Sequence, residues 1–255
     1  MVAELDCESP ESAISSLAAL TGVSSESILE RCRKWRFHNF KRFGLRRGIN
    51  GFDVAREELW RRVIQSETRP LPTSVCWFHA SRVLPSTDFS EGLLPLNRMV
   101  DRLTESIEKA GIRRSRDHEG RYVSSHEHEQ KIEHGSQSWG PDASLVKDAT
   151  FDPAQNHFFR APEAVVDLGF DLDAFIAVTV PCIVKFRSSA DISEHLVDHA
   201  LYYAYLSTWG QRAGIDCSWA WSGEGNLVPA EDILSVEFLD ANDRRTSERW
   251  LDDEQ

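Results

Sequence analysis

The residues best suited to chemistry lie where an apolar run of the chain meets polar side chains. The run Val75-Cys76-Trp77-Phe78 is followed directly by His79-Ala80-Ser81-Arg82. We expect residues 75–78 to form a short buried strand, so that the imidazole, the hydroxyl and the guanidinium stand at a rigid strand end and face a cleft. Residues 89–94 then predict a short helix that ends at Gly92. An imidazole and a hydroxyl held in this way suit recognition of a polar ligand.

A second group of polar residues lies near the C-terminal end of the chain. Apolar and polar residues alternate over 215–222, which predicts a strand. The turn Gly223-Glu224-Gly225 follows it, and residues 233–239 predict a returning strand. Asp216 and Glu224 have the same strand parity, so both carboxylates are expected on one side of an unbroken strand.

These two regions resemble parts of the ADP-ribosyltransferase family. In that family an apolar strand runs into a histidine, a small residue and Ser or Thr, as Trp77-Phe78-His79-Ala80-Ser81 does here. The segment Leu227-Val228-Pro229-Ala230-Glu231-Asp232-Ile233 is similar to the last turn and strand of the family. The resemblance implies an α+β domain with a split mixed β-sheet and NAD as co-substrate in the cleft between its halves.

The resemblance also implies roles for individual residues. His79 would bind the hydroxyls of the adenosine-side ribose, the backbone at Ala80 would meet the nicotinamide amide, and Ser81 would support that turn. Arg82 could pair with the pyrophosphate, because its fork of donors matches phosphate geometry. The family stacks an aromatic ring on the nicotinamide, and the candidates are Tyr122, Phe158, Phe159 and Tyr202. The alternative for His79 is a buried, hydrogen-bonded histidine at a strand end.

The catalytic carboxylate is expected to be Glu224 or Asp216. Cleavage of the bond between nicotinamide and ribose develops positive charge on the sugar, which a neighbouring carboxylate stabilises. The family places a glutamate near the start of a late strand, whereas Glu224 lies in a turn and Asp216 lies nearer the predicted strand start. We favour Glu224, because its side chain reaches further and its flanking glycines permit close approach of a substrate. The alternative for Glu224 is a solvated turn residue.

Charge is unevenly distributed along the chain, whose net charge is −12. Residues 31–62 carry 11 Lys or Arg and 3 Asp or Glu, whereas the remainder carries 18 and 38. Cations interleave there with Trp35, Phe37, Phe40 and Phe43, a pattern that can bind nucleic acid. Two alternatives stay open: the aromatic residues form a small helical core with cations outside, or the basic part docks against the acidic remainder.

The histidine-rich stretch is expected to be a loop without metal. His118, His126, His128 and His134 lie in residues 113–140, which are strongly polar. His-x-His spacing can bind a metal ion, but the neighbouring residues are Ser, Gln, Glu, Lys and Gly, which form no apolar shell to exclude water from such a site. His195 and His199 share one face of a predicted helix, again without a third ligand in view.

The fold class expected from these patterns is α+β. Residues 1–68 predict a helical, basic module, with helices that begin after the capping residues Ser9, either Ser24 or Ser25, and Asp53. Residues 69–240 predict the ADP-ribosyltransferase-like domain, which begins with the linker Arg69-Pro70-Leu71-Pro72, and residues 241–255 predict a charged tail.

Within the second domain, further elements are read from periodicity. Helices are expected over 100–110, from Pro162 onward and over 191–209, and a strand interrupted or edged at Pro181 is expected over 174–186.

Composition points to a globular cytoplasmic protein. The chain is 41% hydrophobic, and its five scattered cysteines fit reduced thiols. A signal peptide and a membrane-spanning apolar run are not expected. We therefore expect a mono-ADP-ribosyltransferase-like enzyme that uses NAD and no metal, modifies a protein or nucleic acid, and serves as a toxin or defence factor by analogy. The alternative is a non-enzymatic nucleic-acid or protein binding module with a degenerate NAD cleft.

Overall fold

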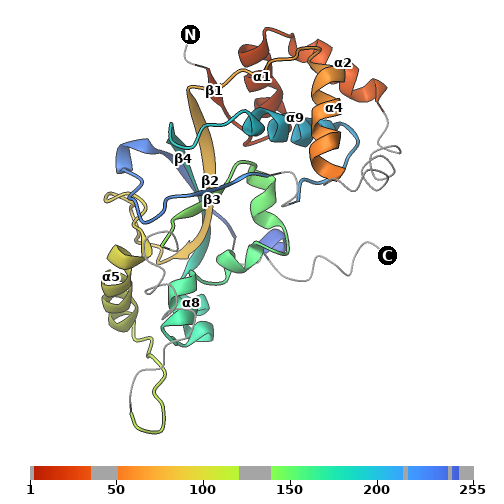
Figure 1. The fold of residues 1–255 in the computed structure, drawn as a ribbon. Helices are drawn as coiled ribbons and strands as arrows, with labels where there is room; N and C mark the ends of the chain where they lie inside the picture. The colour runs from red at the N-terminus through yellow and green to blue at the C-terminus, as the bar shows by residue number, and fades with distance from the viewer. Residues whose placement is uncertain (1–2, 36–50, 121–138, 215–217, 241–242, 247–255) are drawn as a thin grey trace. The chain divides into compact units, whose positions relative to one another are not determined.

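The chain begins with helices and continues into a mostly antiparallel sheet with further helices between its strands (Figure 1). The computed structural model describes residues 3–35, 51–120, 139–214, 218–240 and 243–246. The helices are α1 (Pro10–Thr21), α2 (Ser25–Lys34), α4 (Gly51–Val63), α5 (Leu96–Lys109), α7 (Glu163–Asp167), α8 (Leu172–Val178) and α9 (His195–Thr208). Short 3₁₀ helices are η3 (Lys147–Phe151), η4 (Asn156–Phe159), η6 (Ala230–Asp232) and η7 (Arg244–Thr246). The predicted α+β class is confirmed.

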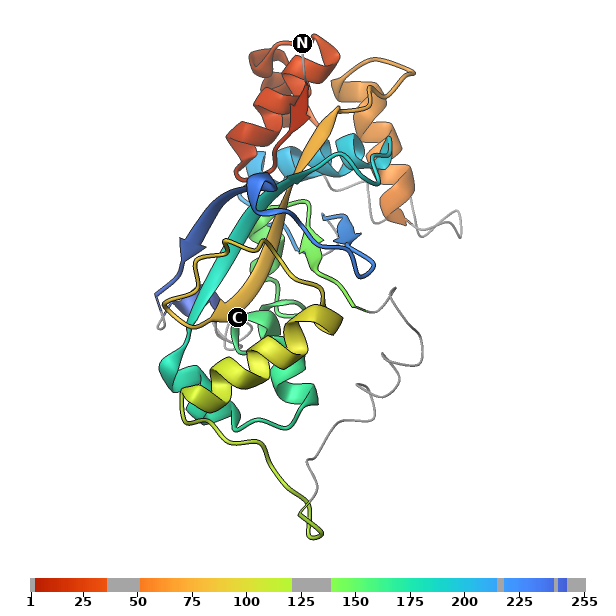
Figure 2. The same cartoon turned by 90° about the vertical axis from the view of Figure 1, so that its left-hand side faces the viewer.

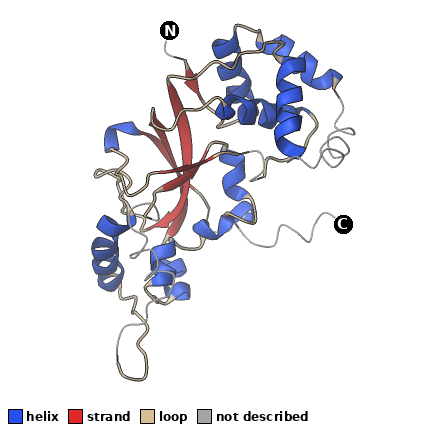
Figure 3. Ribbon diagram, viewed as in Figure 1, coloured by secondary structure: helices blue, strands red, loops and turns tan. Residues whose placement is uncertain are grey.

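The strands are β1 (Glu4–Leu5), β2 (Ser74–Val83), β3 (Asp142–Ser144), β4 (Val180–Ser188), β5 (Ala220–Ser222) and β6 (Ile233–Phe238). Within the described ranges they form one sheet in the order β5-β3-β2-β4-β6, with β1 paired parallel to β2 (Figure 3). β6 runs antiparallel to β4, and the two lie side by side in Figure 2. Residues 233–239 thus form the returning strand that the sequence predicted.

Contacts group the chain into two compact units. The first comprises Met1–Phe78, Ser144–Asp152 and Arg187–Trp221, and the second comprises His79–Ala143, Pro153–Phe186 and Ser222–Gln255. The predicted helical module, 1–68, falls within the first unit, to which α9 and η3 also belong. Each unit is therefore assembled from segments that lie far apart in the sequence.

Local capping signals define the first two helices. Ser9 is the N-cap of α1: its Oγ accepts a hydrogen bond from the Ser12 N–H at 3.2 Å, and Ser12 Oγ accepts one from the Ser9 N–H at 2.9 Å. Gly22 ends α1 with φ 73°, a conformation that costs glycine little. Ser24 is the N-cap of α2, where its Oγ accepts a hydrogen bond from the Ser27 N–H at 3.2 Å. These boundaries agree with the prediction.

Helix α9 is the central element of the first unit. It begins at His195 rather than at the predicted 191, and every residue from Leu196 to Leu206 is buried. Helices α1, α2 and α4 pack against it (Figure 1). A helix with neighbours on several sides must be apolar over most of its circumference.

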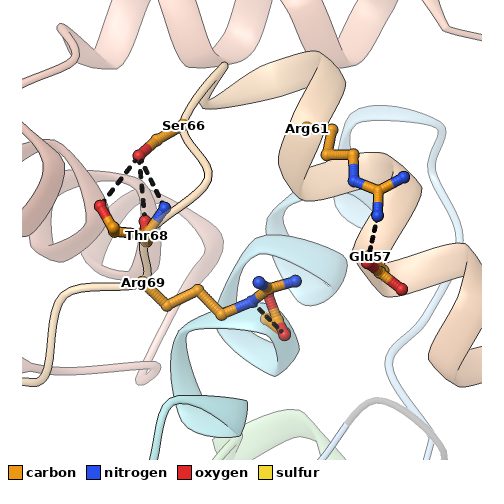
Figure 4. A network of polar contacts seen from close by, with 6 residues as sticks. Glu57, Arg61, Ser66, Thr68 and Arg69 are labelled. Carbon is orange, nitrogen blue, oxygen red and sulfur yellow. Dashed lines mark hydrogen bonds and ion pairs between the residues drawn. The ribbon is translucent and has the colours of Figure 1, made fainter.

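A buried ion pair connects α9 to the linker before β2. Arg69 Nε lies 2.8 Å from Asp198 Oδ1 and 2.7 Å from Oδ2, and the guanidinium lies over the ring of Trp60. Figure 4 shows Arg69 beside the hydrogen bonds that join Ser66 and Thr68. Burial raises the pKa of Asp198, which the hydrogen bond and charge of Arg69 oppose. Loss of either partner would leave a buried charge uncompensated, so the pair holds the linker on α9.

The second unit has its own apolar core. Helices α5, α7 and α8 contribute to a cluster of buried residues: Ile107, Ile112, Ala161, Val165, Leu168, Phe170 and Phe175. Pro162 is the N-cap of α7, where the sequence predicted a helix start. Helix α5 ends at Lys109, one residue before the predicted end, and Gly111 follows it with φ 83°.

Strand β2 is longer than predicted, and this corrects the first expectation about the candidate site. It continues to Val83, so His79, Ala80, Ser81 and Arg82 lie within the strand and not beyond its end. Ala80 and Arg82 are buried, whereas His79 and Ser81 are partly exposed on the opposite face. The alternation was concealed because the buried position 82 carries an arginine.

Two other predicted elements are wrong. Residues 89–92 form a turn and no helix: Phe89 has φ 54°, and the Gly92 N–H donates to its carbonyl at 2.9 Å. The predicted strand 174–186 is divided into α8 and β4, because Asp171 Oδ1 accepts from the Ala174 N–H at 3.0 Å and starts a helix there. Pro181 does not interrupt a strand: it is the second residue of β4, at the N-terminal edge of the strand, as one of the two expected alternatives had it.

The remaining predictions are met in part. β5 is only Ala220–Ser222, shorter than the predicted 215–222, of which 215–217 lie outside the described residues. α4 begins at Gly51, two residues before the predicted cap Asp53. In the charged tail 241–255, only 243–246 is described, and it contains η7. Of the described helices, none has the length and apolar character needed to cross a membrane.

We predict that Ser9→Ala lowers the free energy of unfolding by about 1 kcal/mol, because the Ser12 N–H loses its acceptor at the helix start. Ser15→Ala in the exposed middle of α1 is the matched control, and it should be neutral or slightly stabilising because alanine favours helix. Urea unfolding followed by circular dichroism measures both. Equal effects of the two substitutions would contradict the capping assignment.

Candidate functional site

His79 is held by a backbone carbonyl of the second unit. Its Nδ1 lies 2.7 Å from the carbonyl oxygen of Asp142, the first residue of β3. A carbonyl oxygen only accepts hydrogen bonds, so Nδ1 carries the proton and donates it. In the neutral imidazole the other nitrogen, Nε2, then has a free lone pair. His79 can therefore accept a hydrogen bond from a hydroxyl group of a ligand.

The surroundings of His79 favour this neutral form. His79 is partly exposed, yet desolvation by its surroundings lowers the pKa of the imidazole below its ordinary 6.5, while the hydrogen bond to the Asp142 carbonyl and the charge of the Asp142 carboxylate raise it in part. Desolvation is the larger effect. At neutral pH the ring is consequently an acceptor at Nε2 and a donor at Nδ1.

Glu224 lies at the tip of a tight turn. The Asn226 N–H donates to the Gly223 carbonyl at 2.8 Å, and both central residues have positive φ: 49° at Glu224 and 83° at Gly225. Positive φ at both positions is typical of a type I′ turn. Glycine tolerates it readily, whereas a glutamate there is uncommon. The turn leaves the Glu224 side chain exposed.

The Glu224 turn is bound to the segment that also holds His79. The Gly223 N–H donates to the Pro141 carbonyl at 2.9 Å, and the Gly225 N–H donates to the Gly140 carbonyl at 3.0 Å. A Cβ at position 223 would lie 2.8 Å from Pro141 Cδ and 3.1 Å from the Gly140 oxygen, so only glycine allows this approach. His79 and Glu224 are thus attached to the same three consecutive residues, Gly140, Pro141 and Asp142.

The two segments that carry the family resemblance are also joined directly. Leu93 and Val228 exchange backbone hydrogen bonds of 3.0 Å and 3.1 Å. Gly92 permits this contact, because a Cβ there would lie 2.0 Å from the Val228 carbonyl oxygen. The chain that follows β2 is therefore paired with the chain that precedes β6.

Asp142 is a site residue that the sequence did not identify. Its carbonyl oxygen accepts from His79, and its exposed carboxylate is close enough to raise the imidazole pKa. The local signal was a carboxylate between Gly140-Pro141 and the mostly apolar residues 143–146, a pattern that resembles the start of a strand. That pattern is too common to single out one aspartate.

The other predicted cofactor residues are distributed differently. Ala80 is buried on the far face of β2, and Ser81 is partly exposed on the same face as His79. Phe159 is buried in η4. Tyr202 is buried in α9, in the first unit, and Phe158 packs against His157 with ring centroids 4.1 Å apart. Tyr122 and the alternative carboxylate Asp216 lie outside the described residues.

Arg82 is engaged in the interior of the second unit. Its guanidinium donates to Thr179 Oγ1 at 2.8 Å, to the carbonyls of Phe159 and Ile176 at 2.9 Å, and to the Thr179 carbonyl at 3.0 Å. The residue is only 6% exposed. These bonds satisfy buried carbonyl groups around α8 and η4, so Arg82 joins β2 to these helices.

The described cations of the basic region make contacts within the first unit. Arg31 donates to the Val63 carbonyl at 2.6 Å, and Arg62 lies over the ring of Trp35 and pairs with Glu58 at 2.7 Å. Arg61 pairs with Glu57, as Figure 4 shows. Five cations of the pattern lie outside the described residues, namely Arg36, Lys41, Arg42, Arg46 and Arg47, and nucleic-acid contact stays a prediction.

The histidines show no metal cluster within the part of the chain that the structure describes. His118 is exposed, and His126, His128 and His134 lie outside the described residues. His195 and His199 flank the ring of Trp219, with centroid distances of 5.8 Å and 5.5 Å. Their shared face is therefore occupied by an aromatic contact.

Arg82→Met should lower the free energy of unfolding by about 3 kcal/mol or more, because several buried carbonyls lose their donor. Arg98→Met, on the exposed side of α5, is the control and should change stability by less than about 0.5 kcal/mol. Chemical denaturation measures both. A stable Arg82→Met protein that had lost only NAD binding would instead assign Arg82 to the pyrophosphate.

The fold should become less stable as pH falls, because folding lowers the pKa of His79. A histidine whose pKa is lowered by folding binds its proton more readily in the unfolded chain. Its stabilising contribution is therefore complete above its ordinary value of 6.5 and is lost as pH falls from 6.5 through the lowered folded value. An NMR titration should find the His79 pKa below 6.5, and His79→Gln should reduce the loss of stability between about pH 7.5 and 5. A His79 pKa above 6.5 would contradict the assignment.

The chain matches no family model, no characterised protein and no solved structure. The resemblance to ADP-ribosyltransferases therefore depends on the residues of its two segments, and the activity that they support is a proposal.

Proposed function

We propose that this protein is an NAD-dependent mono-ADP-ribosyltransferase whose site is formed by His79 and the Glu224 turn. The observation that carries the proposal is the attachment of both residues to Gly140–Asp142. His79 Nδ1 binds the Asp142 carbonyl at 2.7 Å, and the turn binds the Pro141 and Gly140 carbonyls at 2.9 Å and 3.0 Å. A histidine and a carboxylate held in fixed relation through one short segment can act on a single ligand.

His79 would position the sugar. With Nδ1–H donating to Asp142, Nε2 accepts a hydrogen bond from a ribose hydroxyl of NAD. The buried strand β2 restrains the imidazole, so the sugar is bound in one orientation. Ser81, two residues along the same face of β2, offers a hydroxyl to the same ligand.

Glu224 would stabilise the transition state. As the bond from ribose C1′ to the nicotinamide nitrogen breaks, nicotinamide leaves with the bonding electron pair and positive charge develops on the sugar. A carboxylate beside that sugar stabilises the charge. The nucleophile of the target then bonds to C1′ and transfers its proton to the Glu224 carboxylate, from which it passes to water. The exposure of Glu224 leaves room for a macromolecular target.

The purified protein should bind NAD and release nicotinamide slowly. His79→Ala should weaken NAD binding by about tenfold, the equivalent of one hydrogen bond. His118→Ala, an exposed histidine of the same unit, is the matched control and should bind as wild type does. Calorimetry measures the affinities. No binding of NAD to the wild-type protein at millimolar concentration would refute the enzyme reading and leave the non-enzymatic binding module as the better account.

The catalytic carboxylate should be revealed by amide substitutions. Glu224→Gln should lower nicotinamide release by about 100-fold while NAD affinity is nearly kept, because the charge acts mainly in the transition state. Asp216→Asn should release nicotinamide as wild type does. The reverse result would transfer the role to Asp216, and turnover unaffected in both would show that neither carboxylate is catalytic.

A further inference from the structure

We infer that Gly140, Pro141 and Asp142 form a positioning segment that sets His79 and Glu224 together, and that Gly223 is the positioning residue that makes this arrangement possible. The structural part of this inference needs no ligand. Its catalytic consequence depends on the proposed function.

Each residue of the segment accepts one hydrogen bond through its carbonyl oxygen. Gly140 accepts from Gly225 at 3.0 Å and Pro141 accepts from Gly223 at 2.9 Å. Asp142 accepts from His79 Nδ1 at 2.7 Å. Both Gly140 and Pro141 are buried, so their carbonyls depend on these donors. A displacement of the segment would therefore change all three contacts together.

Gly223 limits the fit between the turn and the segment. A Cβ at this residue would meet Pro141 Cδ at 2.8 Å, the Gly140 oxygen at 3.1 Å and the Asn226 oxygen at 3.2 Å. Two of these three atoms belong to backbone, which cannot move aside as a flexible side chain can. The smallest possible side chain should consequently push the turn away from Gly140 and Pro141.

Because the turn and His79 are both bound to residues 140–142, a substitution at Gly223 should also alter the hydrogen bond that His79 donates to the Asp142 carbonyl. If the segment moves, the Asp142 carbonyl leaves Nδ1, and the imidazole is no longer fixed as the Nδ1–H tautomer. Glu224 moves in the same event, because it is the residue between Gly223 and Gly225. Gly223 would thus affect both the orientation of the sugar and the position of the charge without touching the substrate.

The test is Gly223→Ala, with Gly111→Ala as the matched control. Gly111 belongs to the same unit and has φ 83°, but a Cβ there meets nothing within 4 Å. Nitrogen-15 NMR of the imidazoles reports the tautomer in the absence of NAD. Wild type and Gly111→Ala should show His79 protonated at Nδ1, and Gly223→Ala should show a shift of population toward Nε2–H. An unchanged His79 spectrum in folded Gly223→Ala would overturn the inference.

A milder variant keeps the test decisive if Gly223→Ala does not fold. Asn226 Nδ2 donates to the Gly223 carbonyl at 2.9 Å, and Asn226→Ala removes only this bond. It should produce a smaller His79 shift in the same direction, and no shift would count against the coupling.

Measuring nicotinamide release by the same variants separates this inference from the proposed function. Nicotinamide release should fall by about 100-fold in Gly223→Ala, mostly in kcat, because a small misplacement of the reacting groups is costly. In a Glu224→Gln background the same substitution should cost much less. If the wild-type protein does not cleave NAD, the proposed function fails, while the NMR result still decides whether the segment couples His79 to the turn.

Discussion

Three consecutive carbonyl oxygens, those of Gly140, Pro141 and Asp142, organise the candidate site. They receive the N–H groups of Gly225 and Gly223 and the Nδ1–H of His79 at 3.0, 2.9 and 2.7 Å. A backbone carbonyl cannot donate, so this arrangement also determines the tautomer of the imidazole. The geometry of the site therefore depends on main-chain hydrogen bonds, which side-chain variation elsewhere would leave largely intact.

Desolvation of the partly exposed imidazole decides how His79 can act. The imidazole gains a hydrogen bond and lies near the Asp142 carboxylate, both of which favour its charged form, but desolvation has the larger influence and lowers its pKa. A charged histidine could only donate, whereas the neutral ring can accept from a hydroxyl. Recognition of a sugar hydroxyl is thus consistent with the environment of His79, and protonation of the ring as pH falls through its lowered pKa should weaken this recognition.

The elements that the sequence predicted well are those with local signals. Ser9, Ser24 and Gly22 define helix ends through contacts with residues three or four positions away, so a short window contains the whole interaction. The Asp171 cap of α8 is equally local and was overlooked, because the β-branched and aromatic residues after it resemble a strand. The sequence also identified His79 and Glu224 as candidates.

Features that depend on long-range contacts could not be predicted. Arg82 resembles a ligand-binding cation, yet its partners Phe159 and Thr179 lie far away in the sequence and bury it. Asp142 lies in the site because β3 pairs with β2, and no sequence pattern around Asp142 predicts that pairing. The same holds for the docking of the Glu224 turn on Gly140 and Pro141.

The central claim is that His79 and the Glu224 turn face one bound nucleotide. A crystal structure of the protein with NAD at millimolar concentration, using Glu224→Gln to preserve the cofactor, tests it most directly. We expect a ribose hydroxyl within hydrogen-bond distance of His79 Nε2 and residue 224 beside the nicotinamide ribose. NAD bound elsewhere, or His79 Nε2 without contact to the sugar, would contradict the account.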